Sequence, residues 1–289
     1  MTGRFGVDRI VQQEDINFLL TNRIPRRLLT RFMGWFSEIE QPAVRSLSFA
    51  VWKFFSGDLS LHEAEQQTFR SVHECFVRRL KPGARPVDSS PDVLVSPCDA
   101  IVGACGTLQG LTALQAKGFD YELNDLLACP RLVERYRNGT YVTLRLTASM
   151  YHRFHAPFDC DVGSVNYISG DTWNVNPIAL RRVARLFCKN ERVVIDTVLR
   201  GSGESATVVA VGAILVASIC LEFLDVPLNL QYRGPHRIPC RATFGKGDEM
   251  GYFRHGSTIL VFATRGLGLA PGVNDGTRIR MGEPLLVHV

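Results

Sequence analysis

Three separated stretches carry side chains that could do chemistry. Asp99 stands in the turn of "SPCDA", His152 and His155 are three residues apart in "YHRFHAP", and Gly256 and Ser257 stand directly ahead of "TILVFA". An acid, an imidazole and a hydroxyl are the parts of a nucleophilic serine site, in which a base activates the hydroxyl and the acid orients the base. The residue types therefore indicate a serine-centred site, provided that the fold brings the three stretches together.

Each stretch also has a plain structural interpretation. A turn Asp commonly bonds its own backbone, and a glycine suits a tight turn. Residues three apart in a regular strand point to opposite faces, so His152 and His155 share a pocket only if the backbone bends, as Pro157 favours. A histidine pair also suggests a metal, but the chain has no HExxH and no obvious third ligand. We therefore expect no metal site.

The composition describes a folded chain. Of its 289 residues, 46% are hydrophobic and 21% charged, and the net charge of +5 is too small to indicate nucleic acid. The eight cysteines show no CxxC spacing, which predicts reduced and mostly buried thiols. The charged opening "MTGRFGVDRIVQQEDINF" lacks the apolar run of a secretory signal. We therefore expect a cytoplasmic location.

The first third of the chain has the pattern of helices. From residue 16 to 56 apolar residues recur every three to four positions, interrupted by Pro25 and Pro42, which predicts two or three short helices. Between residues 16 and 37 the charged residues are Arg23, Arg26, Arg27 and Arg31. Such a helix either lies on an anionic bilayer or packs on its own domain with solvated arginines, and both alternatives remain open. A further helix is predicted over residues 60–80, starting at the Ser60–Glu63 capping pattern.

From about residue 92 the pattern changes to short β-type runs separated by turns. They include "DVLVSP", "TYVTLRL", "RVVIDTVL" and "STILVFA", and residues 206–221 predict two buried strands that bend near Gly212. A short helix is expected within "QAKGFDYELNDLLA", and a helix or a basic loop within residues 176–190. The fold class predicted is α+β, with N-terminal amphipathic helices followed by a mixed, largely antiparallel β core.

Taken together, the motifs resemble a known family. The frame "KGDEMGYFRHGSTILVF" is similar to the self-processing motif of the pyruvoyl-dependent phosphatidylserine decarboxylases, which usually ends in Leu-Gly-Ser-Thr. "YHRFHAP" resembles that family's Tyr-His-Arg-x-His motif, and "SPCDA" its Ser-Pro-x-Asp-Gly turn. The similarity extends over nearly everything after about residue 65.

The resemblance implies a role for each candidate residue. The Ser257 hydroxyl would attack the Gly256 carbonyl, splitting the precursor into a large subunit (1–256) and a small subunit (257–289), and Ser257 would become a pyruvoyl group. His155 would be the base, Asp99 its orienting partner, and His152 would handle a proton during decarboxylation. Residues 1–60 would face a membrane, and residues 61–289 would form the catalytic domain.

The resemblance also implies a substrate and partners. The expected reaction converts phosphatidylserine to phosphatidylethanolamine and carbon dioxide, by a peripheral homodimer on the anionic cytoplasmic face of the cell membrane, without nucleic acid. The alternatives are a pyruvoyl-dependent decarboxylase of a soluble amino acid, a stable Ser-His-Asp hydrolase, and a non-enzymatic membrane scaffold. One position departs from the family, because His255 replaces the usual leucine. Its imidazole would be a filler, a donor to the oxyanion, or a competing base.

Overall fold

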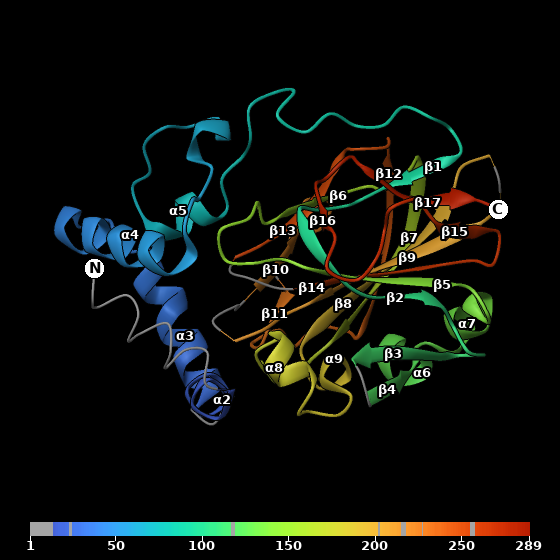
Figure 1. The fold of residues 1–289 in the computed structure, drawn as a ribbon, viewed down its shortest axis with the longest axis horizontal. Helices are drawn as coiled ribbons and strands as arrows, with labels where there is room; N and C mark the ends of the chain where they lie inside the picture. Colours follow the sequence, from blue (N-terminus) through green and yellow to red (C-terminus); the bar gives the residue numbers. More distant parts are fainter. Residues whose placement is uncertain are drawn as a thin grey trace.

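The N-terminal helices stand beside a β body rather than within it (Figure 1). The computed structural model describes residues 14–22, 25–116, 119–201, 203–214, 218–226, 228–254 and 258–289. Arg23, His255, Gly256 and Ser257, to which the sequence assigned roles, lie outside the described residues, as do positions 1–13. The arrangement of helices followed by antiparallel sheets confirms the predicted α+β class.

Prolines and a glycine delimit the first helices. They are α2 (Glu14–Asn22), α3 (Arg26–Ser37) and α4 (Pro42–Ser56). Pro25 directly precedes α3, and Pro42 occupies the first turn of α4, where its missing N–H leaves no intrahelical bond unmade. Gly57 ends α4 with a φ of 74°, a conformation that favours glycine. The prediction of short helices in this part of the chain is therefore confirmed.

The helix predicted over residues 60–80 is wrong. This stretch contains only the 3-10 turn η1 (Leu61–Glu63) and the short helix α5 (Val72–Phe76). Ser60 is left-handed and caps nothing with its side chain, whereas Ser71 accepts from the backbone N of Glu74, 3.1 Å away, so the capping pattern that operates lies further along the chain. A bridge between Ala64 and Leu80 folds the stretch back on itself. Tertiary hydrogen bonds thus replace the helical ones.

The β body is built on an eight-stranded antiparallel sheet in the order β12-β7-β8-β9-β14-β5-β2-β16. Its strands are β12 (Arg237–Phe244), β7 (Cys160–Ile168), β8 (Arg192–Leu199), β9 (Ser205–Val211), β14 (Thr258–Ala263), β5 (Thr140–Arg145), β2 (Ala100–Thr107) and β16 (Arg278–Ile279). The central strands β9 and β14 are buried at every residue. Continuous apolar runs fit this position because both faces of the sheet are covered.

Smaller sheets and short helices surround this sheet. A four-stranded sheet has the order β11 (Leu228–Asn229), β10 (Ser218–Leu221), β13 (Glu249–Phe253) and β6 (Arg153–His155). A three-stranded sheet joins β1 (Val93–Val95), β17 (Pro284–His288) and β15 (Leu267–Leu269), and β3 (Thr112–Ala116) pairs with β4 (Phe119–Glu122). The short helices are α6 (Leu123–Leu127), α7 (Pro130–Val133), η2 (Glu134–Tyr136), α8 (Pro177–Leu180) and α9 (Leu186–Lys189).

Several finer predictions can be compared with these bounds. The two strands expected within residues 206–221 are β9 and β10, so that prediction is confirmed. The expected short helix after "QAKGFDYE" is α6, and the basic stretch 176–190 forms two short helices, α8 and α9. All eight cysteines are free thiols, of which Cys75, Cys98 and Cys160 are buried and the rest half-buried.

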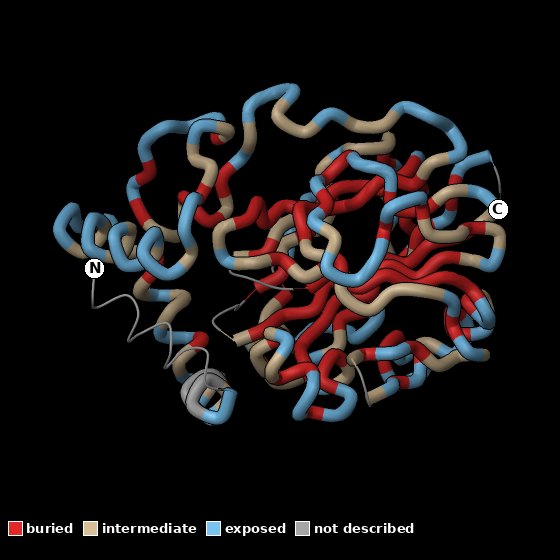
Figure 2. The backbone as a smooth tube through the Cα atoms, in the orientation of Figure 1, coloured by how far each residue is buried: buried red, intermediate tan, exposed pale blue. Residues whose placement is uncertain are grey.

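Burial separates the two parts of the molecule (Figure 2). The main hydrophobic core fills the β body, while a small cluster of Ala64, Phe69 and Cys75 packs against Phe49 and Trp52 of α4. The helices α3 and α4 keep much of their surface exposed. None of the helices in the described ranges combines the length and apolar character needed to cross a membrane.

Candidate active site

Two strands that flank β5 bring distant motifs to the same edge of the large sheet, here called the rim. Strands β2 and β14 flank β5 and both run antiparallel to it, so they run parallel to each other. Arg145 of β5 pairs with Ile101 on one side and with Thr258 on the other. Asp99 directly precedes β2, and in the sequence Ser257 directly precedes β14. Both strands therefore begin at the same rim, two strand spacings or about 10 Å apart.

The Asp99 carboxylate is held by an arginine fork. Arg85 donates from Nε to Oδ1 over 2.8 Å and from Nη2 to Oδ2 over 2.6 Å, and the Met281 backbone N donates to Oδ1 over 2.9 Å. The same guanidinium binds Glu63 at 2.8 Å. Burial opposes the charge of Arg85, but the hydrogen bonds of both carboxylates outweigh it and raise the Arg85 pKa. Asp99 is thus fixed as a buried carboxylate in a bidentate pair.

His155 lies at the same turn as Asp99. Its backbone N donates to Pro97 O over 2.8 Å, while ring Nδ1 contacts Gly247 O at 2.9 Å and ring Nε2 contacts the Tyr151 hydroxyl at 3.0 Å. Since a carbonyl only accepts, Nδ1 carries the proton and Nε2 accepts from Tyr151. Burial lowers the pKa of His155, although the Gly247 carbonyl and the charge of Asp99 oppose this. The imidazole is therefore neutral near pH 7, as a general base must be.

The contacts of His155 bear on its predicted partnership with Asp99. Both ring nitrogens are engaged with groups other than Asp99, and the Asp99 carboxylate is engaged with Arg85. Asp99 acts on the ring through its charge alone in this arrangement. The sequence placed the two residues at one site, but it did not identify Arg85 or Tyr151. Arg85 carries no recognisable motif because its two carboxylate partners are 14 and 22 residues away.

His152 occupies different surroundings from His155. It is fully buried, its Nδ1 lies 2.8 Å from Met150 O, and its ring centroid lies 3.9 Å from that of Phe76. The His152 carbonyl accepts from the Phe253 backbone N over 3.0 Å, at the end of β13. The chain continues from β13 through residues 254–257 into β14. Both histidines therefore adjoin β13, with His155 opposite Glu249 at its start and His152 beside Phe253 at the end nearer Gly256 and Ser257 in the sequence.

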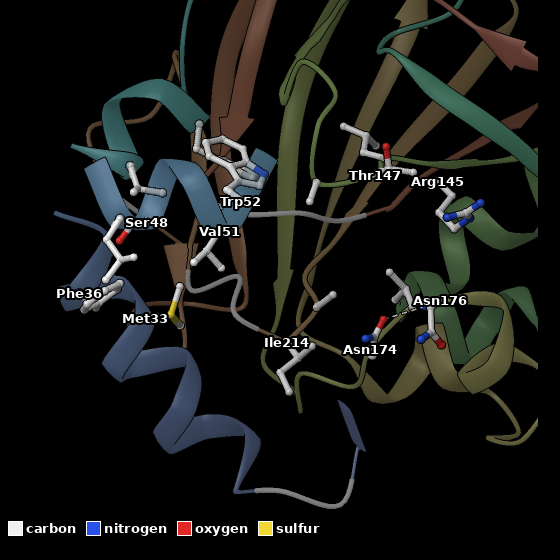
Figure 3. A pocket seen from close by; sticks show the side chains of 17 residues that line it. Met33, Phe36, Ser48, Val51, Trp52, Arg145, Thr147, Asn174, Asn176 and Ile214 are labelled. Carbon is white, nitrogen blue, oxygen red and sulfur yellow. Dashed lines mark hydrogen bonds between the residues drawn. The ribbon is translucent and has the colours of Figure 1, made fainter. Parts of the chain in front are cut away.

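A cavity of about 740 Å³ lies between the helices and this rim. Figure 3 shows Trp52 and Val51 of α4 on one side and Arg145 and Thr147 across from them. The lining is mostly apolar and includes Phe76, the ring that contacts His152. An apolar cavity with a few polar groups at one end is typical of a site for an amphipathic ligand.

Two of the three arginines of α3 contact the β body. Arg26 pairs with Asp171 at 2.5 Å and lies 3.8 Å over the Trp173 ring, and Arg27 donates to Gly170 O over 2.9 Å. Arg26 and Arg27 therefore attach α3 to the β body, whereas Arg31 is exposed, and contact of this helix with a bilayer stays a prediction. The large apolar residues most exposed on α3 and α4 are Leu28 (66%) and Trp35 (63%) of α3, and Leu47 (68%) and Phe55 (64%) of α4.

The residues that the structure describes include no group of three or more histidine, cysteine or carboxylate side chains placed to hold a metal ion. The described polar groups here are the Asp99 carboxylate, the His152 and His155 imidazoles and the Tyr151 hydroxyl, and each is hydrogen-bonded to a neighbouring protein group. This donor set suits proton transfer at a nucleophilic serine.

Comparison with known proteins agrees with the geometry. Residues 72–287 match the phosphatidylserine decarboxylase family. The phosphatidylserine decarboxylase proenzyme of Brevibacillus brevis is 34% identical over 270 residues, covering 92% of this chain and 95% of the relative. Those of Saccharophagus degradans (34% over 282 residues, 94% and 96% covered) and Vibrio cholerae (35% over 277 residues, 90% and 94%) are similar. The chain therefore belongs to the phosphatidylserine decarboxylase family.

Proposed function

We propose that this chain cleaves itself between Gly256 and Ser257, carries the resulting pyruvoyl group, and converts phosphatidylserine to phosphatidylethanolamine and carbon dioxide. The observation that supports this most is the shared rim, where the strands headed by Asp99 and Ser257 begin beside the same strand. The relatives' description as proenzymes supports processing. The apolar cavity at that rim favours a lipid over a soluble amino acid.

In the proposed cleavage, the Ser257 hydroxyl adds to the Gly256 carbonyl. His155 takes the hydroxyl proton and returns it to the Ser257 nitrogen, so that the ester bond forms as the peptide C–N bond breaks. The Ser257 Cβ–O bond then breaks as the α-proton is removed, so that the oxygen leaves as part of the Gly256 carboxylate and residue 257 becomes dehydroalanine. This residue tautomerises to an imine, and water hydrolyses the imine to ammonia and the pyruvoyl group. The neutral state of His155 fits this role, and Tyr151 has to release Nε2 before the proton can transfer.

In the proposed decarboxylation, the pyruvoyl carbonyl supplies the electron sink that amino-acid side chains lack. His152 delivers the proton to the carbon that has lost carbon dioxide, since its backbone adjoins the end of β13. The apolar walls from α3, α4 and α5 hold acyl chains and exclude water from the reacting end. His255 acts as a filler ahead of the cleavage point.

The lipid substrate calls for contact with a membrane. We propose that the exposed side chains of α3 and α4 insert among the headgroups of an anionic bilayer, as a peripheral attachment at the cytoplasmic face. Apolar burial supplies this binding, because Arg26 and Arg27 are engaged with the β body. On the family resemblance we also propose a homodimer in which each protomer holds its own large and small subunits.

Intact-mass analysis of the purified protein tests the cleavage. We expect two fragments, residues 1–256 and 257–289, the smaller beginning with a carbonyl in place of an amine. Ser257→Ala should remain one chain, whereas Ser90→Ala, which alters an exposed serine, should be cleaved normally. An active protein that runs as one intact chain would refute the proposal and favour the serine hydrolase.

The two histidines should separate the two stages. We expect His155→Ala to remain uncleaved, and His152→Ala to be cleaved but to release no carbon dioxide from phosphatidylserine vesicles. The reverse pattern would exchange the two roles. Release of carbon dioxide from free amino acids alone, with none from vesicles, would favour the soluble-substrate alternative.

A further inference from the structure

We propose that Arg145 binds the phosphodiester of the lipid substrate and thereby selects a phospholipid over a free amino acid. This inference rests on the proposed function and identifies a residue that none of the sequence motifs includes. It concerns binding of the headgroup, whereas the residues discussed above concern cleavage and proton transfer.

Arg145 is a half-buried cation in an apolar wall. Among the described residues that line the cavity, it is the one charged side chain. Its guanidinium makes no hydrogen bond and no ion pair within 4.0 Å to any residue in the described ranges; Asp275, whose charge acts on it, lies beyond that distance. Desolvation lowers the pKa of Arg145. Folding thus leaves a guanidinium at the edge of the cavity with its donors available, at a cost that an anionic ligand would offset.

A second polar group next to Arg145 also lacks a partner. Thr258 is directly cross-strand from Arg145, and its side chain is 1% exposed. Its Oγ1 makes no hydrogen bond within the described part of the chain. Directly opposite residues in an antiparallel pair point to the same face, with Cβ atoms about 5 Å apart. The two side chains therefore leave the sheet on the same face, where we infer that both donate to oxygens of the phosphate.

Two other polar side chains that line the cavity already accept hydrogen bonds from the backbone. The Asn176 side-chain oxygen accepts from the Ala179 backbone N over 2.8 Å, and that of Asn174 accepts from the Asn176 backbone N over 2.9 Å. Arg26 and Arg27 of α3 hold Asp171 and Gly170, and the described residues that line this cavity include no arginine of α3. Arg145 is left as the cation of the cavity wall.

The chemistry of the reaction decides between the two anionic groups of the substrate. An ion pair to the carboxylate would stabilise the charge that the reaction has to remove, and would therefore oppose decarboxylation. The phosphate charge stays unchanged throughout, so a contact to it binds ground state and transition state equally.

The first test measures steady-state kinetics on phosphatidylserine vesicles. Because the loss of a charge-assisted hydrogen bond weakens binding, we expect Arg145→Gln to raise KM by roughly tenfold to one-hundredfold with kcat within about twofold. Arg145→Lys should give an intermediate KM, since it keeps the charge without the fork. The control Arg131→Gln alters an exposed arginine of α7 and should leave both parameters unchanged. A lower kcat with an unchanged KM, or no change at all, would overturn the proposal.

The second test uses binding without turnover. In the uncleaved Ser257→Ala protein, isothermal titration calorimetry should detect glycerophosphoserine, and the affinity should fall at least tenfold when Arg145→Gln is added. Free serine should bind far more weakly, and inorganic phosphate should compete with glycerophosphoserine. Equal affinity of the Ser257→Ala protein for free serine and glycerophosphoserine would refute the assignment. This comparison does not depend on whether the Arg145→Gln variant folds. Failure of the proposed function would instead appear in the unmodified protein, as absent cleavage or absent carbon dioxide.

Discussion

Replacing Glu191 by glutamine should remove a pH dependence of stability from the β body. Glu191 directly precedes β8 with 2% of its surface exposed, and its Oε2 has no hydrogen-bond partner in the part of the chain that the structure describes. Burial raises the pKa of this carboxyl from 4.5 to about 8, with the Tyr167 hydroxyl and the charge of Arg27 opposing. The folded protein therefore keeps a proton on Glu191 that the unfolded chain releases.

The sign and size of the effect follow from this difference. Because the folded pKa is raised, the stabilisation is fully present below about pH 4.5 and is lost as the pH rises through about 8. Between these limits the unfolding free energy falls by about 1.4 kcal/mol per pH unit. From pH 5.5 to 7.5 the stabilisation that Glu191 contributes falls by about 2.5 kcal/mol.

Urea unfolding at pH 5.5 and 7.5 measures this contribution. The unmodified protein should lose about 2.5 kcal/mol more than Glu191→Gln between the two pH values. Glu65→Gln, which alters an exposed carboxyl, should follow the unmodified protein. Parallel losses in the unmodified protein and Glu191→Gln would show that the carboxyl is ionised in the fold, and the reasoning from its burial would be refuted.

Two further predictions concern packing and the membrane. A Cβ on Gly251 would lie 2.2 Å from Cys220 O and 2.8 Å from Phe154 Cζ, so Gly251→Ala should lower the unfolding free energy by about 3 kcal/mol in urea. Gly163→Ala, whose Cβ meets nothing within 4 Å, should cost much less, and equal losses would contradict the packing argument. Trp35→Ser should weaken sedimentation with anionic vesicles by about tenfold, since about 1.5 kcal/mol of apolar burial is lost. Leu114→Ser, at a 41% exposed residue of β3, is its control, and unchanged binding by Trp35→Ser would exclude α3 from the contact.

The sequence by itself determined the elements whose pattern is local. Apolar spacing and prolines predicted the helices α2 to α4, and β-branched runs predicted the central strands, because period and backbone restriction act within a few residues. It also identified Asp99, His152, His155, Gly256 and Ser257 through their likeness to family motifs. The comparisons confirm that the chain belongs to this family, whereas the roles of the individual residues stay predictions.

Only the tertiary structure decided what these residues contact. Sequence patterns predicted a helix over residues 60–80, but long-range hydrogen bonds such as the Ala64–Leu80 bridge outweigh local propensity there. The Arg85–Asp99 pair, the attachment of Arg26 to Asp171 and the lone guanidinium of Arg145 all depend on groups far apart in the chain. Strand order places Asp99 and the start of β14 at one rim, because β5 lies between two strands that begin 158 residues apart, at Ala100 and Thr258. No local sequence pattern predicts this arrangement, because it forms only when β2 and β14 pair with the two edges of β5.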